Sequence, residues 1–102
     1  MKVSPGSRWR SAVCDTEVVV VKGPREPGVL ACGGTAMLAM GAERPAGAAP
    51  DPQLSGGTQL GKRYADEMQG LELLCTKAGK GSLTFEGRPL TIRAATRLPS
   101  SD

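Results

Sequence analysis

Residues 16–22, which read TEVVVVK, decide the fold of this chain. The segment is dominated by β-branched residues, which restrict side-chain rotation and favour the extended backbone of a strand. Asp15 precedes it and Gly23-Pro24 follows it, so turn-forming residues bound it on both sides. This pattern predicts a β-strand.

Further short apolar stretches are separated by glycine- and proline-rich turns, and each is predicted to form a strand. They occupy residues 29–32, 37–40, 71–77, 82–85 and 90–93. Tight turns are expected at Cys32-Gly33-Gly34, at residues 78–81 and at residues 86–89. We therefore expect an all-β fold.

Two segments differ in composition from these strands. Residues 41–60 are rich in proline, glycine and alanine and have no apolar periodicity, so they are predicted to be a linker, mobile or draped over the surface. Residues 98–102 are expected to form an unstructured tail. The linker divides the chain into a first unit, residues 1–40, and a second unit, residues 61–97.

The composition argues against several classes of function. The net charge of the 102-residue chain is only +3, its basic residues are scattered, and it has three aromatic residues, so nucleic-acid binding is not expected. The longest apolar run, residues 18–21, is far too short to span a bilayer, and the start of the sequence lacks the apolar core of a signal peptide. A cytoplasmic location with reduced thiols is the expectation.

The chain contains no histidine. Imidazole bases, Ser-His and Cys-His nucleophile pairs and histidine metal ligands are therefore excluded. A metal site would have to use thiolates and oxygen ligands. No catalytic constellation is recognised in the sequence, and no enzymatic activity is predicted.

The two units resemble each other. Shifting the chain by 55 positions places Gly6-Ser7-Arg8-Trp9 on Gly61-Lys62-Arg63-Tyr64. A two-residue deletion in the following turn keeps the later part in step. The identical pairs are Gly6/Gly61, Arg8/Arg63, Glu17/Glu72, Lys22/Lys77, Gly28/Gly81, Leu30/Leu83 and Gly34/Gly87. The pattern predicts a tandem repeat of one short β unit.

Each copy resembles the desulforedoxin unit, a small iron-binding fold also found at the N-terminus of desulfoferrodoxins. That family has an aromatic residue, a Cys-x-x-Cys knuckle, a strand, a glycine-containing turn and then Cys-Cys-Gly-x-x-Met. The matching segments are Trp9 with residues 11–14 and 32–37 in the first copy, and Tyr64 with residues 66–69 and 85–90 in the second. Because desulforedoxin units form homodimers, the resemblance implies that the two copies pack as an internal pseudo-dimer.

Most metal ligands of that family are missing here. The four thiolate positions are occupied by Ser11, Cys14, Cys32 and Gly33 in the first copy. In the second copy they are occupied by Asp66, Gln69, Phe85 and Glu86. The buried space left by an ion is expected to be filled by Phe85. The third cysteine, Cys75, matches Val20, where the family has no ligand.

Cys14 and Cys32 are the candidate site residues. The resemblance implies that their sulfurs lie close together, as two thiols, as a disulfide, or as a two-thiolate iron or zinc site completed by Ser11, Asp15, water or a partner. The leading functional interpretation is a non-catalytic accessory subunit that binds a larger enzyme subunit and carries no cofactor. The alternative is a mononuclear iron or zinc module, or a thiol redox module, that uses Cys14 and Cys32.

Two weaker signals are set aside. Residues 56–63 (GGTQLGKR) fit the start of a phosphate-binding loop, but Arg63 stands where serine or threonine should bind magnesium, and no helix is expected to follow. The neighbouring acids Asp66 and Glu67, like Asp15 and Glu17, are interpreted as surface or turn residues.

Overall fold

The all-β fold class is confirmed by the computed structural model, which describes residues 3–43, 47 and 49–93. These residues contain ten strands, one turn of 3-10 helix (η1) and no α-helix. The elements are β1 (Arg8–Arg10), β2 (Glu17–Lys22), β3 (Leu30–Cys32), β4 (Thr35–Ala36), β5 (Leu38–Ala39), η1 (Pro52–Leu54), β6 (Arg63–Asp66), β7 (Leu71–Lys77), β8 (Leu83–Phe85), β9 (Arg88–Pro89) and β10 (Thr91–Arg93). No helix among the described residues has the length and apolar character needed to cross a membrane.

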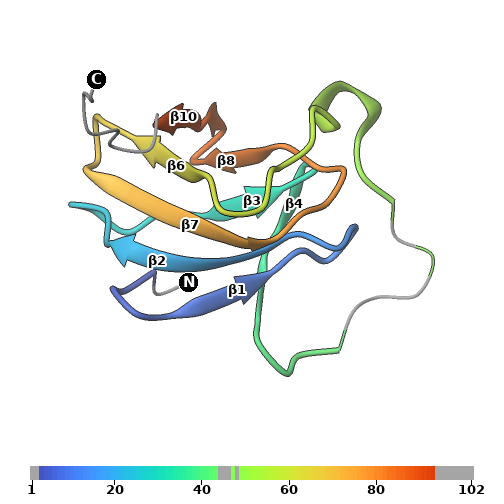
Figure 1. The fold of residues 1–102 in the computed structure, drawn as a ribbon, viewed down its shortest axis with the longest axis horizontal. Helices are drawn as coiled ribbons and strands as arrows, with labels where there is room; N and C mark the ends of the chain where they lie inside the picture. Colours follow the sequence, from blue (N-terminus) through green and yellow to red (C-terminus); the bar gives the residue numbers. More distant parts are fainter. Residues whose placement is uncertain (1–2, 44–46, 48, 94–102) are drawn as a thin grey trace, which may run out of the picture.

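The strands form two antiparallel sheets, both visible in Figure 1. The larger sheet has the order β10-β6-β7-β2-β1-β5, with β7 and β2 at its centre. The smaller sheet has the order β4-β3-β8-β9. In both sheets, the central pair joins one strand from residues 1–40 to one strand from residues 61–97.

The longer strands lie where the sequence predicted them, and β7 matches the predicted residues 71–77 completely. β5 lies within the predicted residues 37–40, whereas the strands β1, β4, β6 and β9 were not predicted. The turn expected at residues 86–89 was wrong in part, because Arg88–Pro89 forms β9 against β8. Such a short strand is defined by its hydrogen-bonded partner rather than by its own composition, so local sequence does not reveal it.

The pairings of the two halves follow the same registers. Trp9 lies opposite Val18 in the first half, and Tyr64 lies opposite Leu73 in the second. Trp9 and Tyr64 are 55 positions apart in the sequence, and so are Val18 and Leu73; this is the shift that aligned the two halves. Backbone hydrogen bonds agree with this correspondence, because Gly6 donates to Val20 as Gly61 donates to Cys75, at 2.8 and 2.9 Å.

The core contains side chains from both sheets and both halves. The largest fully buried side chains are Phe85, Leu30, Leu71, Leu73 and Val18. Removing these side chains from water supplies most of the stabilisation, at about 25 cal/mol per Å² of apolar area. Neither half buries this set alone, which agrees with the expectation that a unit of this size depends on a partner surface.

The segment predicted as a linker contacts both halves. The Asp51 N–H donates to the Gly33 carbonyl at 2.9 Å, and the Ser82 N–H donates to the Leu54 carbonyl at 2.7 Å. In Figure 1 the segment, coloured green, runs along the outside of one end of the molecule. Most of its described residues are exposed or half-buried, Thr58 is buried, and backbone hydrogen bonds attach the segment to both halves. The tail predicted at residues 98–102 lies outside the described residues.

Candidate functional site

The structure brings Cys14 and Cys32 together at one end of the core. Cys14 ends the knuckle between β1 and β2, and Cys32 is the last residue of β3. Their Sγ atoms are 3.7 Å apart, and both residues are recorded as reduced thiols. Because a disulfide bond is about 2.05 Å long, a modest rotation of the side chains would be needed to form it.

Ser11 organises the knuckle that presents Cys14. Its side chain is completely buried, and its Oγ accepts hydrogen bonds from the N–H groups of Val13 (3.1 Å) and Cys14 (3.0 Å). A serine hydroxyl that accepts from the following backbone N–H groups stabilises a tight turn. Ser11 stands at the first ligand position of the resembling family, and here it fixes the position of the Cys14 sulfur.

Two hydroxyl groups surround that sulfur. Cys14 Sγ lies 3.3 Å from Ser11 Oγ and 3.3 Å from Thr16 Oγ1. The Thr16 hydroxyl is in turn 2.8 Å from the Thr58 hydroxyl, which accepts a hydrogen bond from the Gly79 N–H at 3.0 Å. A chain of hydroxyl groups therefore connects the thiol to the second half of the protein.

The segment Gly79-Lys80-Gly81 covers the pair of thiols. The Gly81 N–H donates a hydrogen bond to Cys14 Sγ at 3.3 Å. A Cβ atom on Gly81 would lie 2.8 Å from Cys32 Sγ, and one on Gly79 would lie 2.4 Å from Thr16 Oγ1. Only glycine fits at these two positions, because any side chain would overlap with the atoms that build the site.

The surroundings of the two thiols shift their pKa values in opposite directions. Burial alone would raise the pKa of Cys14, but its hydrogen bonds with the Ser11 and Thr16 side chains, together with backbone hydrogen bonds at Thr16 and Gly81, outweigh it and lower the pKa to about 7. The pKa of Cys32 is raised to about 12, first by burial and then by the negative charge of the Cys14 thiolate. Hydrogen bonding to the charged form of a thiol stabilises that form, and desolvation destabilises it. The thiolate form is therefore reached at lower pH for Cys14 than for Cys32.

A pocket of about 300 Å³ opens over Cys14. Its lining comprises Val13, Cys14, Asp15, Ala49, Pro50, Gly79 and Lys80. Cys14 has an exposed fraction of 8%, whereas Cys32 is completely buried behind it. A reagent from solvent would therefore meet Cys14 first.

The donor set does not fit the four-thiolate iron site of the resembling family. The described residues contain no group of three or more cysteine, aspartate or glutamate side chains arranged to hold a metal ion. The fourth ligand position is Gly33, where a Cβ atom would lie 2.8 Å from Val13 Cγ2 and 2.9 Å from Pro50 Cβ. The space of a fourth ligand is thus filled by apolar atoms. A two-thiolate iron or zinc site at Cys14 and Cys32 stays a prediction.

The matching positions of the second half form an ion pair in place of a thiol cluster. Asp66 Oδ1 accepts from the Met68 N–H at 3.1 Å, as Ser11 Oγ accepts from Val13. Asp66 Oδ2 pairs with the Arg88 guanidinium at 2.8 Å. Phe85 is completely buried and belongs to the core. Both members of the thiol pair therefore belong to the first half.

Several site residues were missed from the sequence. Thr16 and Thr58 look like ordinary strand and linker residues, and only the fold brings their hydroxyls together. The repeated glycine around Lys80 was interpreted as a turn, although closely spaced glycines can also mark a close backbone approach. Cys75 takes no part in the pair, because it is buried in β7 and its sulfur donates to the Lys77 carbonyl at 3.2 Å.

The other sequence signals have structural roles. The glycine-rich residues 56–63 lead into β6 rather than into a helix, so the context of a phosphate-binding loop is missing. The carboxylate of Asp66 is engaged by Arg88, as described above. Neither feature adds a second catalytic candidate.

Comparisons with known proteins give no match: no protein-family model fits the chain, and no curated protein or solved structure matches it significantly. The functional assignment therefore depends on the geometry of the chain itself.

Proposed function

We propose that the chain is a thiol redox module in which Cys14 and Cys32 alternate between a dithiol and an intramolecular disulfide. The observation that carries the proposal is the 3.7 Å separation of the two sulfurs. This was the alternative interpretation of the sequence, and it is the one that the geometry favours. In the reducing cytoplasm predicted for the chain, such a disulfide would be transient, as is usual for catalytic or sensing pairs.

The chemistry balances with a small disulfide as oxidant. The two protein thiols lose two electrons and two protons, one S–S bond forms between Cys14 and Cys32, and the external disulfide is reduced to two thiols. A nucleophilic thiol beside a buried, protonated thiol is the arrangement that redox-active pairs use. The pKa of Cys14 is lowered and that of Cys32 is raised, which supports Cys14 as the attacking thiol and Cys32 as its partner.

Equilibration of the purified protein in glutathione redox buffers tests the proposal. We expect reversible formation of the Cys14–Cys32 disulfide, detected by peptide mass spectrometry after the remaining thiols are alkylated. The Cys75→Ser variant is the matched control and should retain the disulfide, whereas Cys14→Ser and Cys32→Ser should lose it. A protein whose thiols all stay reduced, even in the most oxidising buffer, would refute the proposal.

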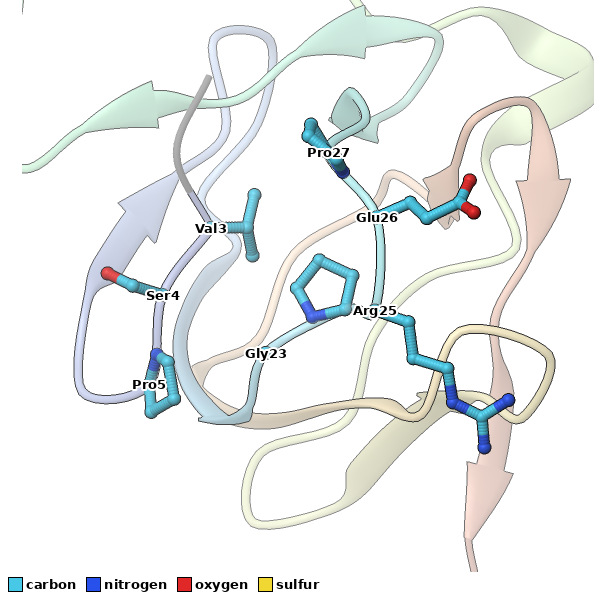
Figure 2. A pocket seen from close by; sticks show the side chains of 8 residues that line it. Val3, Ser4, Pro5, Gly23, Arg25, Glu26 and Pro27 are labelled. Atoms are coloured by element: carbon cyan, nitrogen blue, oxygen red, sulfur yellow. The ribbon is translucent and has the colours of Figure 1, made fainter.

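We also keep the proposal that the chain is an accessory subunit of a larger enzyme, because one surface feature favours it. A groove of about 680 Å³ lies between residues 3–5 and residues 23–27. In Figure 2, Val3 points into this groove, whereas Arg25 extends away from it. Its lining includes Pro5, Pro24 and Pro27, which present apolar surface without a backbone donor.

The second proposal also includes a duplicated scaffold, in which the two halves of the chain are copies of one β unit. The matching registers of the two halves support a tandem repeat packed as an internal pseudo-dimer. Desulforedoxin-like ancestry is part of the proposal and is based on the sequence resemblance alone. Native mass spectrometry of the endogenous protein tests the accessory role, and we expect a complex with a larger chain. Substitution of Pro27 by Asp, at an exposed position in the groove lining, should weaken that complex, with Leu60→Asp, at a residue that is 66% exposed and outside the groove lining, as the matched control. A monomer in the native extract would contradict this role.

A further inference from the structure

The pocket over Cys14 indicates what size of oxidant can reach the pair of thiols. Cys14 is 8% exposed and lines a pocket of about 300 Å³. Thiol–disulfide exchange needs the attacking sulfur to approach a disulfide in line, so limited access to Cys14 slows a large disulfide substrate more than a small reagent. A peroxide molecule is small enough to reach the sulfur. The pocket therefore favours small oxidants.

We propose that a small hydroperoxide enters this pocket and oxidises Cys14 to a sulfenic acid, which Cys32 then attacks to form the disulfide. This inference rests on the thiol redox function proposed above and adds to it the class of substrate and the order of the steps. The geometry that carries it is a pocket lined by Cys14, with the sulfur of Cys32 3.7 Å from that of Cys14.

Both steps balance. In the first, the Cys14 thiolate attacks one peroxide oxygen, an S–O bond forms, the O–O bond breaks, and the departing hydroxide or alkoxide takes a proton from solvent. In the second, Cys32 attacks the sulfenic sulfur, an S–S bond forms, the S–O bond breaks, and hydroxide leaves with the Cys32 proton as water. The dithiol thus gives two electrons to the peroxide. A small external dithiol would restore the reduced pair by exchange.

The surroundings of the two sulfurs support this order. Hydrogen bonds with the Ser11 and Thr16 side chains, and the one that the Gly81 N–H donates, favour the thiolate form of Cys14, which is the form that attacks peroxides. The thiolate charge on Cys14 is the second cause, after burial, that raises the pKa of Cys32. Oxidation of Cys14 to a neutral sulfenic acid removes that charge, so Cys32 becomes easier to ionise only after the first step.

Trapping of the sulfenic acid with dimedone tests the inference on the full-length chain. Hydrogen peroxide should produce a dimedone adduct at Cys14 in the Cys32→Ser variant, and a Cys14–Cys32 disulfide in its place in the unmodified protein. The Cys14→Ser variant should lose both products. The Cys75→Ser variant should behave like the unmodified protein. Cys32→Ala provides a second variant in which to trap the adduct if the serine hydroxyl disturbs the buried site.

The rate of disulfide formation provides an independent readout. Hydrogen peroxide should oxidise the pair about tenfold faster than oxidised glutathione at equal concentration, because access to the recessed sulfur limits the larger reagent. A dimedone adduct at Cys32 rather than Cys14, or a faster reaction with oxidised glutathione, would overturn the inference. If the pair equilibrates in glutathione buffers but gives no sulfenic acid with peroxide, only this inference fails. If no disulfide forms with any reagent, the proposed function fails with it.

Discussion

The Gly81 N–H donates a hydrogen bond to Cys14 Sγ across 3.3 Å, so the nucleophilic sulfur of the first half is held by a turn from the second half. Ser11 and Thr16 supply the other contacts from the same half as Cys14. The site is therefore a property of the whole fold. A fragment that contained only residues 1–40 would have both thiols without this contact.

Replacement of Gly81 by Ala is expected to destabilise the protein. The added Cβ would lie 2.8 Å from Cys32 Sγ and 2.9 Å from the Gly33 nitrogen. Overpacking of this kind costs about 1–3 kcal/mol. Urea unfolding measures the loss, and the exposed neighbour Lys80→Ala, expected to change stability by less than about 0.5 kcal/mol, is the control. Equal stability of the two variants would contradict this prediction, because it would show that the turn accommodates a methyl group at position 81.

The reactivity of Cys14 should rise as the pH increases through about 7 and then level off. The folded protein lowers this pKa below its ordinary value, so the thiolate that reacts with iodoacetamide accumulates at a lower pH than in a free cysteine. The alkylation rate of each cysteine, followed by mass spectrometry from pH 5 to pH 9, measures this.

Cys32 and Cys75 provide the internal comparison for that measurement. Burial raises the pKa of both, and the pKa of Cys32 reaches about 12, so both should stay unreactive at neutral pH. The prediction would be wrong if the alkylation rate of Cys14 reached half of its maximum near pH 9.0, the ordinary pKa of a cysteine thiol. Unfolding in urea should bring the three rates together.

Glu86 is expected to carry backbone strain. It is the one non-glycine residue with positive φ in the described part of the chain, at φ 52°, and it matches Gly33 of the first half, at φ 65°. Left-handed backbone costs a residue with a side chain about 1–2 kcal/mol relative to glycine. Glu86→Gly should therefore be more stable than Glu86→Ala by about 1 kcal/mol, after allowance for the backbone entropy of glycine.

The two Glu86 variants are matched, because both remove the hydrogen bond that the Val29 N–H donates to Glu86 Oε2 at 2.5 Å. Their difference in unfolding free energy thus isolates the backbone term. Chemical denaturation provides the value. An Ala variant as stable as the Gly variant would mean that residue 86 relaxes to an ordinary conformation at little cost.

Metal analysis distinguishes the thiol module from a metal module. We expect the purified protein to hold less than one iron or zinc per chain, because the described residues arrange no third anionic ligand beside Cys14 and Cys32. Elemental analysis of protein purified without chelators measures the content. One metal per chain, lost in both Cys14→Ser and Cys32→Ser but retained in Cys75→Ser, would favour the two-thiolate iron or zinc site and contradict the redox proposal.

The sequence by itself determined the all-β fold class. β-branched runs such as residues 16–22 and glycine-containing turns such as Cys32-Gly33-Gly34 act over a few neighbouring residues, so their composition is enough to place β2 and β3. The shift that aligned Trp9 with Tyr64 in sequence also relates the registers of β1 with β2 and of β6 with β7.

Only the tertiary structure decided what surrounds Cys14. Two residues around this site come from distant parts of the sequence. Thr58 is 42 residues from its hydrogen-bond partner Thr16, and Gly81 is 67 residues from Cys14. Their contacts with the site depend on the pairing of β2 with β7 and of β3 with β8, which closes the two halves onto each other. Local composition sets backbone preference, whereas the acidity of a thiol depends on the atoms that replace water around it.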